Sequence, residues 1–118
     1  SKRRRASHLV AICRRRQRPS EKKRIPEWEE TAAVACAVQN MHLLATSLQL
    51  GAYWSSWYEL FRTSPECVRF LGLEPEQGDV CMGVLCVGAM EPDTLAAIQR
   101  LGAPGRLPPE SYAVWHGE

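Results

Sequence analysis

The residues of this chain that could do chemistry do not form a familiar catalytic motif. Ser55 and Ser56 lack the flanking glycines of a nucleophile elbow, and no histidine is spaced to activate either hydroxyl. Gly102 and Gly105 resemble part of a phosphate-binding loop, but the Lys-Ser or Lys-Thr pair of such a loop is missing. The sequence therefore predicts no catalytic residue that acts by itself.

The thiols and imidazoles do not suggest a metal site either. Cysteines stand at five positions, an odd number, and no two of them form a C-x-x-C pair. The residues are Cys13, Cys36, Cys67, Cys81 and Cys86, with His8, His42 and His116 scattered along the same chain. We predict free and mostly buried thiols, which suit a reducing compartment. The protein is accordingly expected inside the cell, in the cytoplasm or an organelle, without a bound metal.

The longest apolar segment, residues 31–56, must position whatever site exists. Its apolar residues recur at helical spacing, and Pro26 and Gly51 suit the start and the end of a helix over about residues 27–50. Small or apolar residues on nearly every side predict that this helix is buried on most sides. The acidic residues of its first turn, Glu27, Glu29 and Glu30, match the helix dipole and do not suggest a catalytic carboxylate pair.

The remaining segments complete a single α+β domain. Strands are predicted over residues 7–13, 52–56 and 79–89, and shorter helices over 65–71 and 93–101. Gly83 and Gly88 stand in the last strand where another backbone can pass closely. We expect the long helix to lie buried against a mixed or antiparallel sheet. No membrane span is expected, because polar residues interrupt the helix.

Charge is distributed unevenly along the chain. Residues 1–24 hold eleven of the fifteen Lys and Arg residues, whereas residues 25–118 hold twelve of the thirteen acids. The basic loop over residues 14–24 is interpreted as a solvated, mobile connection between a strand and the long helix. Two alternatives are a nucleic-acid contact, which is unlikely because no aromatic residue is interleaved for base stacking, and a counter-charge for the acidic remainder or an acidic partner.

A series of motifs points to a family. Ile25-Pro26-x-Trp28-Glu29 is followed by Ala37-Val38-Gln39-Asn40-Met41, Leu43, Gly51, Trp54-Ser55-Ser56, Ser64-Pro65, Val68-Arg69, Leu71-Gly72, Gly83 and Gly88. In this order and spacing they resemble the C-terminal half of the FMN-dependent nitroreductases, above all the small single-domain bacterial and algal or plant branch. The resemblance covers about residues 6–90 and implies an incomplete domain, as in a fragment.

Three parts of the chain follow from this resemblance. Residues 1–24 comprise a basic stub, a strand and the Arg-rich loop, and residues 25–102 form the nitroreductase-like core. Residues 103–118 form an extended, Pro-rich C-terminal arm, which is expected to wrap onto another subunit or to be disordered.

The resemblance also implies an activity. Family members are homodimeric flavoproteins that take a hydride from NADH or NADPH onto flavin N5 and pass the electrons to nitroaromatic or quinone-like acceptors. The flavin carries this chemistry itself, which agrees with the missing catalytic motif. The implied FMN contacts are the backbone of Trp54, Ser55 and Ser56 with Arg106 near the phosphate, and Leu44 matches a position near the nicotinamide or substrate.

Two departures from the family pattern support an alternative. Trp57 stands where the family often has a glycine, so the local turn must form without a residue that adopts positive φ easily. The Arg-Arg-Ser run that holds the FMN phosphate in the family has no counterpart at the matching place. The alternative function is therefore a non-catalytic scaffold, a degenerate nitroreductase fold that has lost FMN.

Overall fold

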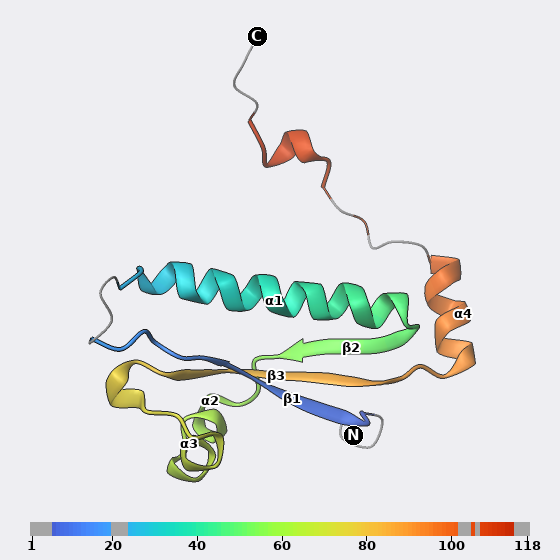
Figure 1. The fold of residues 1–118 in the computed structure, drawn as a ribbon. Coiled ribbons are helices and arrows are strands. Elements are labelled where there is room, and N and C mark those ends of the chain that lie inside the picture. The colour runs from blue at the N-terminus through green and yellow to red at the C-terminus, as the bar shows by residue number, and fades with distance from the viewer. Residues whose placement is uncertain (1–5, 20–23, 102–104, 106, 115–118) are drawn as a thin grey trace.

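The chain folds as a three-stranded sheet with a long helix along one of its faces (Figure 1). The computed structural model describes residues 6–19, 24–101, 105 and 107–114. The elements follow in the order β1 (His8–Arg14), α1 (Glu27–Ser47), β2 (Leu50–Ser55), α2 (Glu59–Arg62), α3 (Pro65–Leu71), η2 (Pro75–Gln77), β3 (Val80–Ala89), α4 (Pro92–Leu101) and η3 (Pro109–Ser111). The predicted α+β class is confirmed.

The sheet is antiparallel with β3 in its centre. Its order is β1-β3-β2, and both neighbours of β3 run antiparallel to it. As the central strand, β3 has both of its edges paired. Leu85 in β3 has no exposed surface and lies directly between Val10 of β1 and Trp54 of β2.

The core lies between this sheet and α1. Ile12, Val38 and Leu85 form its buried centre. Partly buried residues pack around them from the helix and all three strands: Val10, Val34, Met41, Ala52, Trp54, Met82 and Val87. The predicted packing of the long helix against a sheet is confirmed on this face of α1.

The opposite face of α1 is bare, which corrects the prediction of burial on most sides. Leu43, Leu44 and Leu48 are each about 60% exposed. The sheet of one chain can cover only one side of a straight helix, so an all-round apolar sequence leaves a second apolar face. That face is available to another polypeptide.

The end of α1 also differs from the prediction. The helix stops at Ser47, three residues before the expected end, and Gln49 turns the chain with a φ of 57°. Gly51, which we expected to end the helix, is instead part of β2 opposite Gly88. By contrast, α3 is confirmed as predicted: the Cys67 peptide N–H donates to Ser64 Oγ, and Gly72 ends the helix with a φ of 63°.

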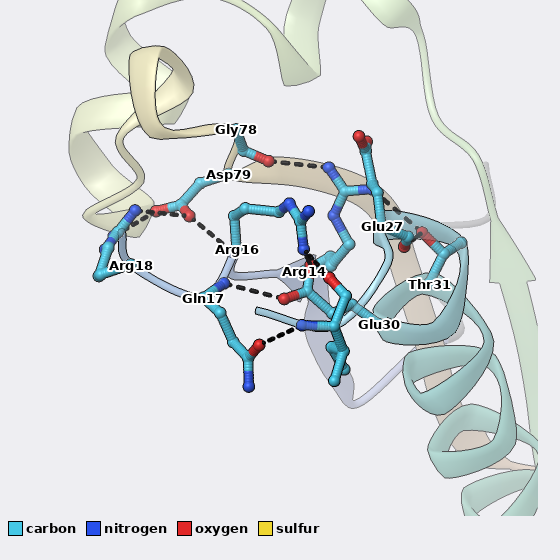
Figure 2. Close-up of polar contacts among 10 residues, drawn as sticks. Arg14, Arg16, Gln17, Arg18, Glu27, Glu30, Thr31, Gly78 and Asp79 are labelled. Atoms are coloured by element: carbon cyan, nitrogen blue, oxygen red, sulfur yellow. Dashed lines mark hydrogen bonds and ion pairs between the residues drawn. The ribbon is translucent and has the colours of Figure 1, made fainter. Parts of the chain in front are cut away.

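The Arg-rich connection between β1 and α1 is tied down by ion pairs, at least over its described residues 14–19 (Figure 2). Arg14 is 6% exposed, lies 2.6 Å from Glu27 and donates to the carbonyl of Gly78. Arg16 Nη1 lies 2.7 Å from the buried Glu30 carboxylate. The prediction of a solvated connection is therefore wrong here, and the alternative of a counter-charge for acidic residues fits.

Asp79, immediately before β3, anchors the same segment. Asp79, 2% exposed, accepts hydrogen bonds from the Arg18 guanidinium and from the peptide N–H groups of Arg16 and Glu74. Burial raises the pKa of Asp79, but these hydrogen bonds outweigh it and hold the pKa below its ordinary value. We call the group of Arg14, Arg16, Arg18, Glu27, Glu30 and Asp79 the arginine clamp.

Candidate functional site

The candidate flavin contacts lie where β2 ends. Trp54 packs into the core, and its Nε1 donates to the carbonyl of Met82 at 3.2 Å. Ser55, opposite Val84, is the last paired residue of the strand. Ser56 lies beyond the ladder and is exposed. The three residues thus run from the core to the surface within one strand end.

The turn after Ser56 has an unusual backbone. Trp57 has a φ of 59°, in the left-handed region that costs a non-glycine residue about 1–2 kcal/mol. Its peptide N–H donates to Ser55 Oγ at 3.2 Å, and its indole stacks on the Phe61 ring with centroids 5.6 Å apart. The turn therefore takes a positive φ with tryptophan, and local contacts hold it there.

Gly83 of β3 makes room for this turn. It has a φ of 116°, and a Cβ at this position would lie 2.1 Å from the carbonyl oxygen of Ser55 and 2.9 Å from Cα of Ser56. The prediction that another backbone passes closely at Gly83 is confirmed, and the passing segment is the candidate flavin contact itself.

Ser56 presents unused hydrogen-bonding groups at the surface. Among the described residues, neither its peptide N–H nor its hydroxyl has a hydrogen-bond partner. An exposed peptide beside a rigid turn can donate to a ring nitrogen or carbonyl without a conformational change, which reduces the entropy lost on binding. The described residues therefore fit the edge of a planar heterocycle such as the flavin ring.

The other candidate contacts are not brought to Ser56. Leu44 lies on the bare side of α1 near the beginning of β2, and this six-residue strand extends about 20 Å before it reaches Ser56. Leu44 and Ser56 of one chain therefore do not line the same site. Arg106, the candidate phosphate ligand, lies outside the described residues. The roles of Trp54, Ser55, Ser56, Leu44 and Arg106 stay predictions.

An apolar pocket of about 370 Å³ adjoins the strained turn. It is lined by Leu9, Ala11, Trp57, Phe61, Arg62, Glu66, Cys67, Phe70, Leu71, Cys81 and Val84. The sequence analysis did not identify this pocket, although the spacing of Trp57 and Phe61, four residues apart, was a usable signal. Its position on the sheet face away from α1 makes it a second structural feature beside Ser56.

The cysteines are free, as predicted, but they differ in exposure. Cys81 is buried, whereas Cys36 is exposed on α1, which corrects the expectation of burial for that residue. Burial and the neighbouring Cys81 raise the pKa of the Cys13 thiol to about 11. In the described part of the chain, no His, Cys, Asp and Glu residues group as a metal site.

No helix among the described residues combines the length and the apolar character needed to cross a membrane. A comparison with curated proteins finds no match. Among solved structures, a nitroreductase-like family protein from Bacillus cereus is similar, with a TM-score of 0.55 and 25% identity. The similarity covers 82% of this chain and 46% of that chain, so this chain spans less than half of the solved relative.

The family comparison gives the same assignment over most of the chain. A model described as the Nitroreductase family matches residues 2–89, close to the range of about 6–90 predicted from the motifs. The residues that the family model matches include the whole sheet and α1. The chain therefore belongs to the Nitroreductase family.

Proposed function

We propose that this chain forms part of an FMN-dependent NAD(P)H oxidoreductase of nitroreductase type. The observation that carries the proposal is Ser56, whose exposed peptide N–H and hydroxyl have no partner among the described residues beside a backbone turn held by Trp57 and Gly83. Family membership supports FMN as the ring that such an edge would bind. NADH or NADPH is the proposed electron donor, and a nitroaromatic or quinone-like molecule the proposed acceptor.

The chain's own part in this reaction is to hold the ring. When bound, FMN supplies the hydride chemistry. Ser55 and Ser56 offer hydrogen bonds to the edge of the ring, and the closeness of Gly83 to Ser55 keeps these groups from moving away from it. Arg106 is the proposed contact to the phosphate. The remaining contacts are proposed to come from a second copy of this chain and from the part of the fold that the solved relative has beyond the matched 46%.

A homodimer is part of the proposal. The bare side of α1 exposes Leu43, Leu44 and Leu48, with Ala33 and Ala37 also exposed on the helix. Small residues allow close approach of a second helix, and burial of three leucines supplies the driving force. In such a dimer Leu44 of one copy is proposed to reach the ring site of the other, which the distance within one chain does not allow.

The test is a flavin titration. FMN is added to the purified 118-residue chain, and to the chain joined to a complementary nitroreductase half, while flavin fluorescence is recorded. We expect quenching in the joined form and slow bleaching of the flavin absorbance on addition of NADPH. Riboflavin, which lacks the phosphate, is the matched control ligand and should bind more weakly. A folded, joined protein that leaves FMN fluorescence unchanged contradicts the proposal.

A second candidate function is a non-catalytic scaffold. Trp57 favours it, because the bulky indole takes the position of the family's glycine next to the ring site and projects toward the apolar pocket. In that case the joined form folds and dimerises but does not bind FMN, and Trp57→Gly is expected to restore binding. The titration therefore separates the two functions.

A further inference from the structure

Three of the five cysteines come together where β1, β3 and α3 meet. Cys13 lies in β1, Cys67 in α3 and Cys81 in β3. Cys67 and Cys81 line the same pocket, and the thiols of Cys13 and Cys81 share a hydrogen bond. The three residues are far apart in the sequence and close in the fold, and none of them is among the proposed contacts to FMN.

An irregularity in the sheet places Cys13 opposite Cys81. Ile12 pairs with Gly83, but the next residue, Cys13, pairs with Cys81, so the register shifts by one residue between them. Without this shift Cys13 would lie opposite Met82, whose side chain packs against the core. Cross-strand partners in an antiparallel sheet have Cα atoms about 4.5–5.5 Å apart. A disulfide needs a Cα separation of about 4.4–6.8 Å, so the register allows one between Cys13 and Cys81.

The contacts of the thiols favour Cys13 over Cys67 as the partner of Cys81. Burial and the neighbouring Cys81 raise the pKa of both Cys13 and Cys67, but only the Cys13 thiol also shares a hydrogen bond with Cys81. All three cysteines are free in this structure, which therefore shows the reduced form. The closest pair of thiols is thus the pair that the register also aligns.

We propose that Cys13 and Cys81 are a site of oxidative modification, a dithiol that low-molecular-weight disulfides such as glutathione disulfide convert to a disulfide between β1 and β3. The thiolate of Cys13, which is less buried than Cys81, attacks one sulfur of glutathione disulfide and displaces a glutathione thiolate. The Cys81 thiolate then attacks the Cys13 sulfur and displaces the second glutathione thiolate. The two protons of the protein thiols end on the two released glutathione molecules. The dithiol is oxidised by two electrons, and glutathione disulfide is reduced by two.

The environment of Cys13 determines how fast this exchange runs in each direction. Burial and Cys81 raise the pKa of Cys13 to about 11, and only the thiolate attacks a disulfide, so oxidation is slow near neutral pH. A thiol of high pKa is also a poor leaving group, so reduction of the disulfide by glutathione is slow as well. The site therefore suits a lasting modification better than a rapid response.

The disulfide would fasten the fold beside two features described above. Cys13 directly precedes Arg14 of the arginine clamp, and Cys81 is two residues from Asp79 of the same clamp. Cys81 is also two residues from Gly83, which the Ser55 carbonyl approaches. A covalent link between residues 13 and 81 restricts the unfolded chain over this long segment, so it stabilises the folded state.

The experiment incubates the purified, reduced 118-residue chain with excess glutathione disulfide and maps its disulfides by mass spectrometry without reduction. Trypsin separates the three cysteines of the cluster into peptides 6–14, 63–69 and 70–100. We expect peptide 6–14 joined to peptide 70–100, and fragmentation should place the bond on Cys81 and not on Cys86, which lies in the same peptide. The urea midpoint of the oxidised chain should rise by about 1 M or more and return to its first value with dithiothreitol.

Two cysteines of the same chain are controls for the reagent. Cys36 is exposed on α1 and should gain one glutathione without forming a protein disulfide. Cys86 lies opposite Leu9 and Tyr53, so Cys86→Ser should leave the disulfide and the rise of the urea midpoint unchanged. Cys13→Ser should abolish both effects. The mapping of the unchanged chain stands by itself if this variant does not fold.

Three outcomes overturn the proposal. Cys13 and Cys81 could stay free thiols while Cys36 gains glutathione, Cys67 could be bonded to Cys81 in place of Cys13, or the bond could form only in urea. Since no flavin is added at any step, failure of the flavin titration does not affect the result.

Discussion

Gly83 illustrates how one hydrogen in place of a methyl group can decide a backbone path. A Cβ there would lie 2.1 Å from the carbonyl oxygen of Ser55, and no flexible side chain can yield to relieve the contact. The residue also has a φ of 116°, which L side chains rarely adopt. The end of β2 can therefore approach β3 this closely only because residue 83 is glycine.

We accordingly expect Gly83→Ala to lower the free energy of unfolding by about 2–4 kcal/mol, since both the clash and the backbone strain oppose it. Urea unfolding followed by circular dichroism measures the change. Gly105→Ala is the control, because no atom lies within 4 Å of a Cβ at that position, and it should change stability by less than about 0.5 kcal/mol. An unchanged midpoint for Gly83→Ala contradicts the close approach.

Two substitutions of Trp57 separate the energetic cost of its positive φ from the stabilisation that its ring contact provides. Trp57→Ala and Trp57→Gly both remove the stack on Phe61, but only glycine relieves the positive φ of 59°. The glycine variant should therefore be about 1 kcal/mol more stable than the alanine variant, the reverse of their usual order. Unfolding midpoints of the two variants give the answer, and an alanine variant that is equally stable argues against the strained turn.

Cysteine reactivity gives a further test at the scale of single residues. Burial and the neighbouring Cys81 raise the pKa of Cys13 to about 11, so only about one thiol in a thousand is ionised at pH 8. Iodoacetamide should modify the exposed Cys36 well before Cys13, as peptide mass spectrometry can follow. Labelling in urea is the control, where the two rates should converge. Equal rates in the folded protein contradict the described environment of Cys13.

At the scale of elements, the ion pairs of the arginine clamp hold the connection between β1 and α1 in place of apolar packing. It joins β1, the start of α1 and the segment before β3 through residues that are far apart in sequence (Figure 2). The peptide N–H of Gln17 holds the pKa of Glu30 below its ordinary value, with burial opposing and Arg16 assisting. Charged carboxylates are thus required for the clamp to form.

The sign of the pH dependence follows from these lowered pKa values. Glu30 and Asp79 stabilise the fold in full above their ordinary pKa values of 4.5 and 3.8, and the contribution is lost as the pH falls through the lower folded-state values. Asp79→Asn should cost about 2 kcal/mol at pH 7 and flatten the loss of stability below about pH 4. Urea unfolding at pH 7, 4 and 3 measures both effects.

Glu29→Gln is the control for this experiment, because Glu29 is exposed and has no ion pair among the described residues. It should keep the acid dependence of the unchanged chain. If Asp79→Asn loses stability below pH 4 as steeply as the unchanged chain, the clamp is not the source of the acid sensitivity.

The elements themselves were predictable because their signals are local. The apolar spacing of α1 and the Ser64-to-Gly72 capping pattern of α3 depend on neighbouring residues only. The early end of α1 was not predictable, because the apolar pattern continues through Leu48 and Leu50 while Gln49 takes positive φ without a glycine. The clamp was also missed as a structure, since the partners Arg18 and Asp79 lie 61 residues apart.

The same distinction, between local signals and contacts of residues far apart in the sequence, holds for the candidate site. The motif around Trp54 located the strand end, and its unusual turn could be anticipated from Trp57 standing at a glycine position. The pocket beside it could not, because it is formed by three separate segments that meet only in the fold: β1, the α2–α3 region and β3. Residue spacing reveals a site within one element, whereas a site between elements depends on how they pack.

At the scale of the whole molecule, the chain has two apolar surfaces with different shapes. The bare side of α1 is the outer surface of a single helix and suits another helix of the same kind. The sheet face away from α1 is hollowed by the pocket of about 370 Å³, and a side chain from a different element suits this hollow better. Figure 1 shows α1 on one side of the sheet and the α2–α3 region, which contributes to the pocket, on the other, so both surfaces can be occupied at once.

The bare side of α1 gives a prediction about self-association. In the joined form of the flavin titration, Leu43→Asp should convert the dimer to monomers, weakening the association about tenfold or more. The reason is that Leu43, Leu44 and Leu48 are each about 60% exposed in the single chain, and a second helix would bury them. Sedimentation velocity across a concentration series measures the shift in mass. Leu107→Asp, at an exposed position after α4, is the charge-matched control and should leave the dimer intact. A joined form that stays monomeric at every concentration without any substitution would show that α1 does not form the dimer contact, and Leu44 could then not reach the ring site of a second copy.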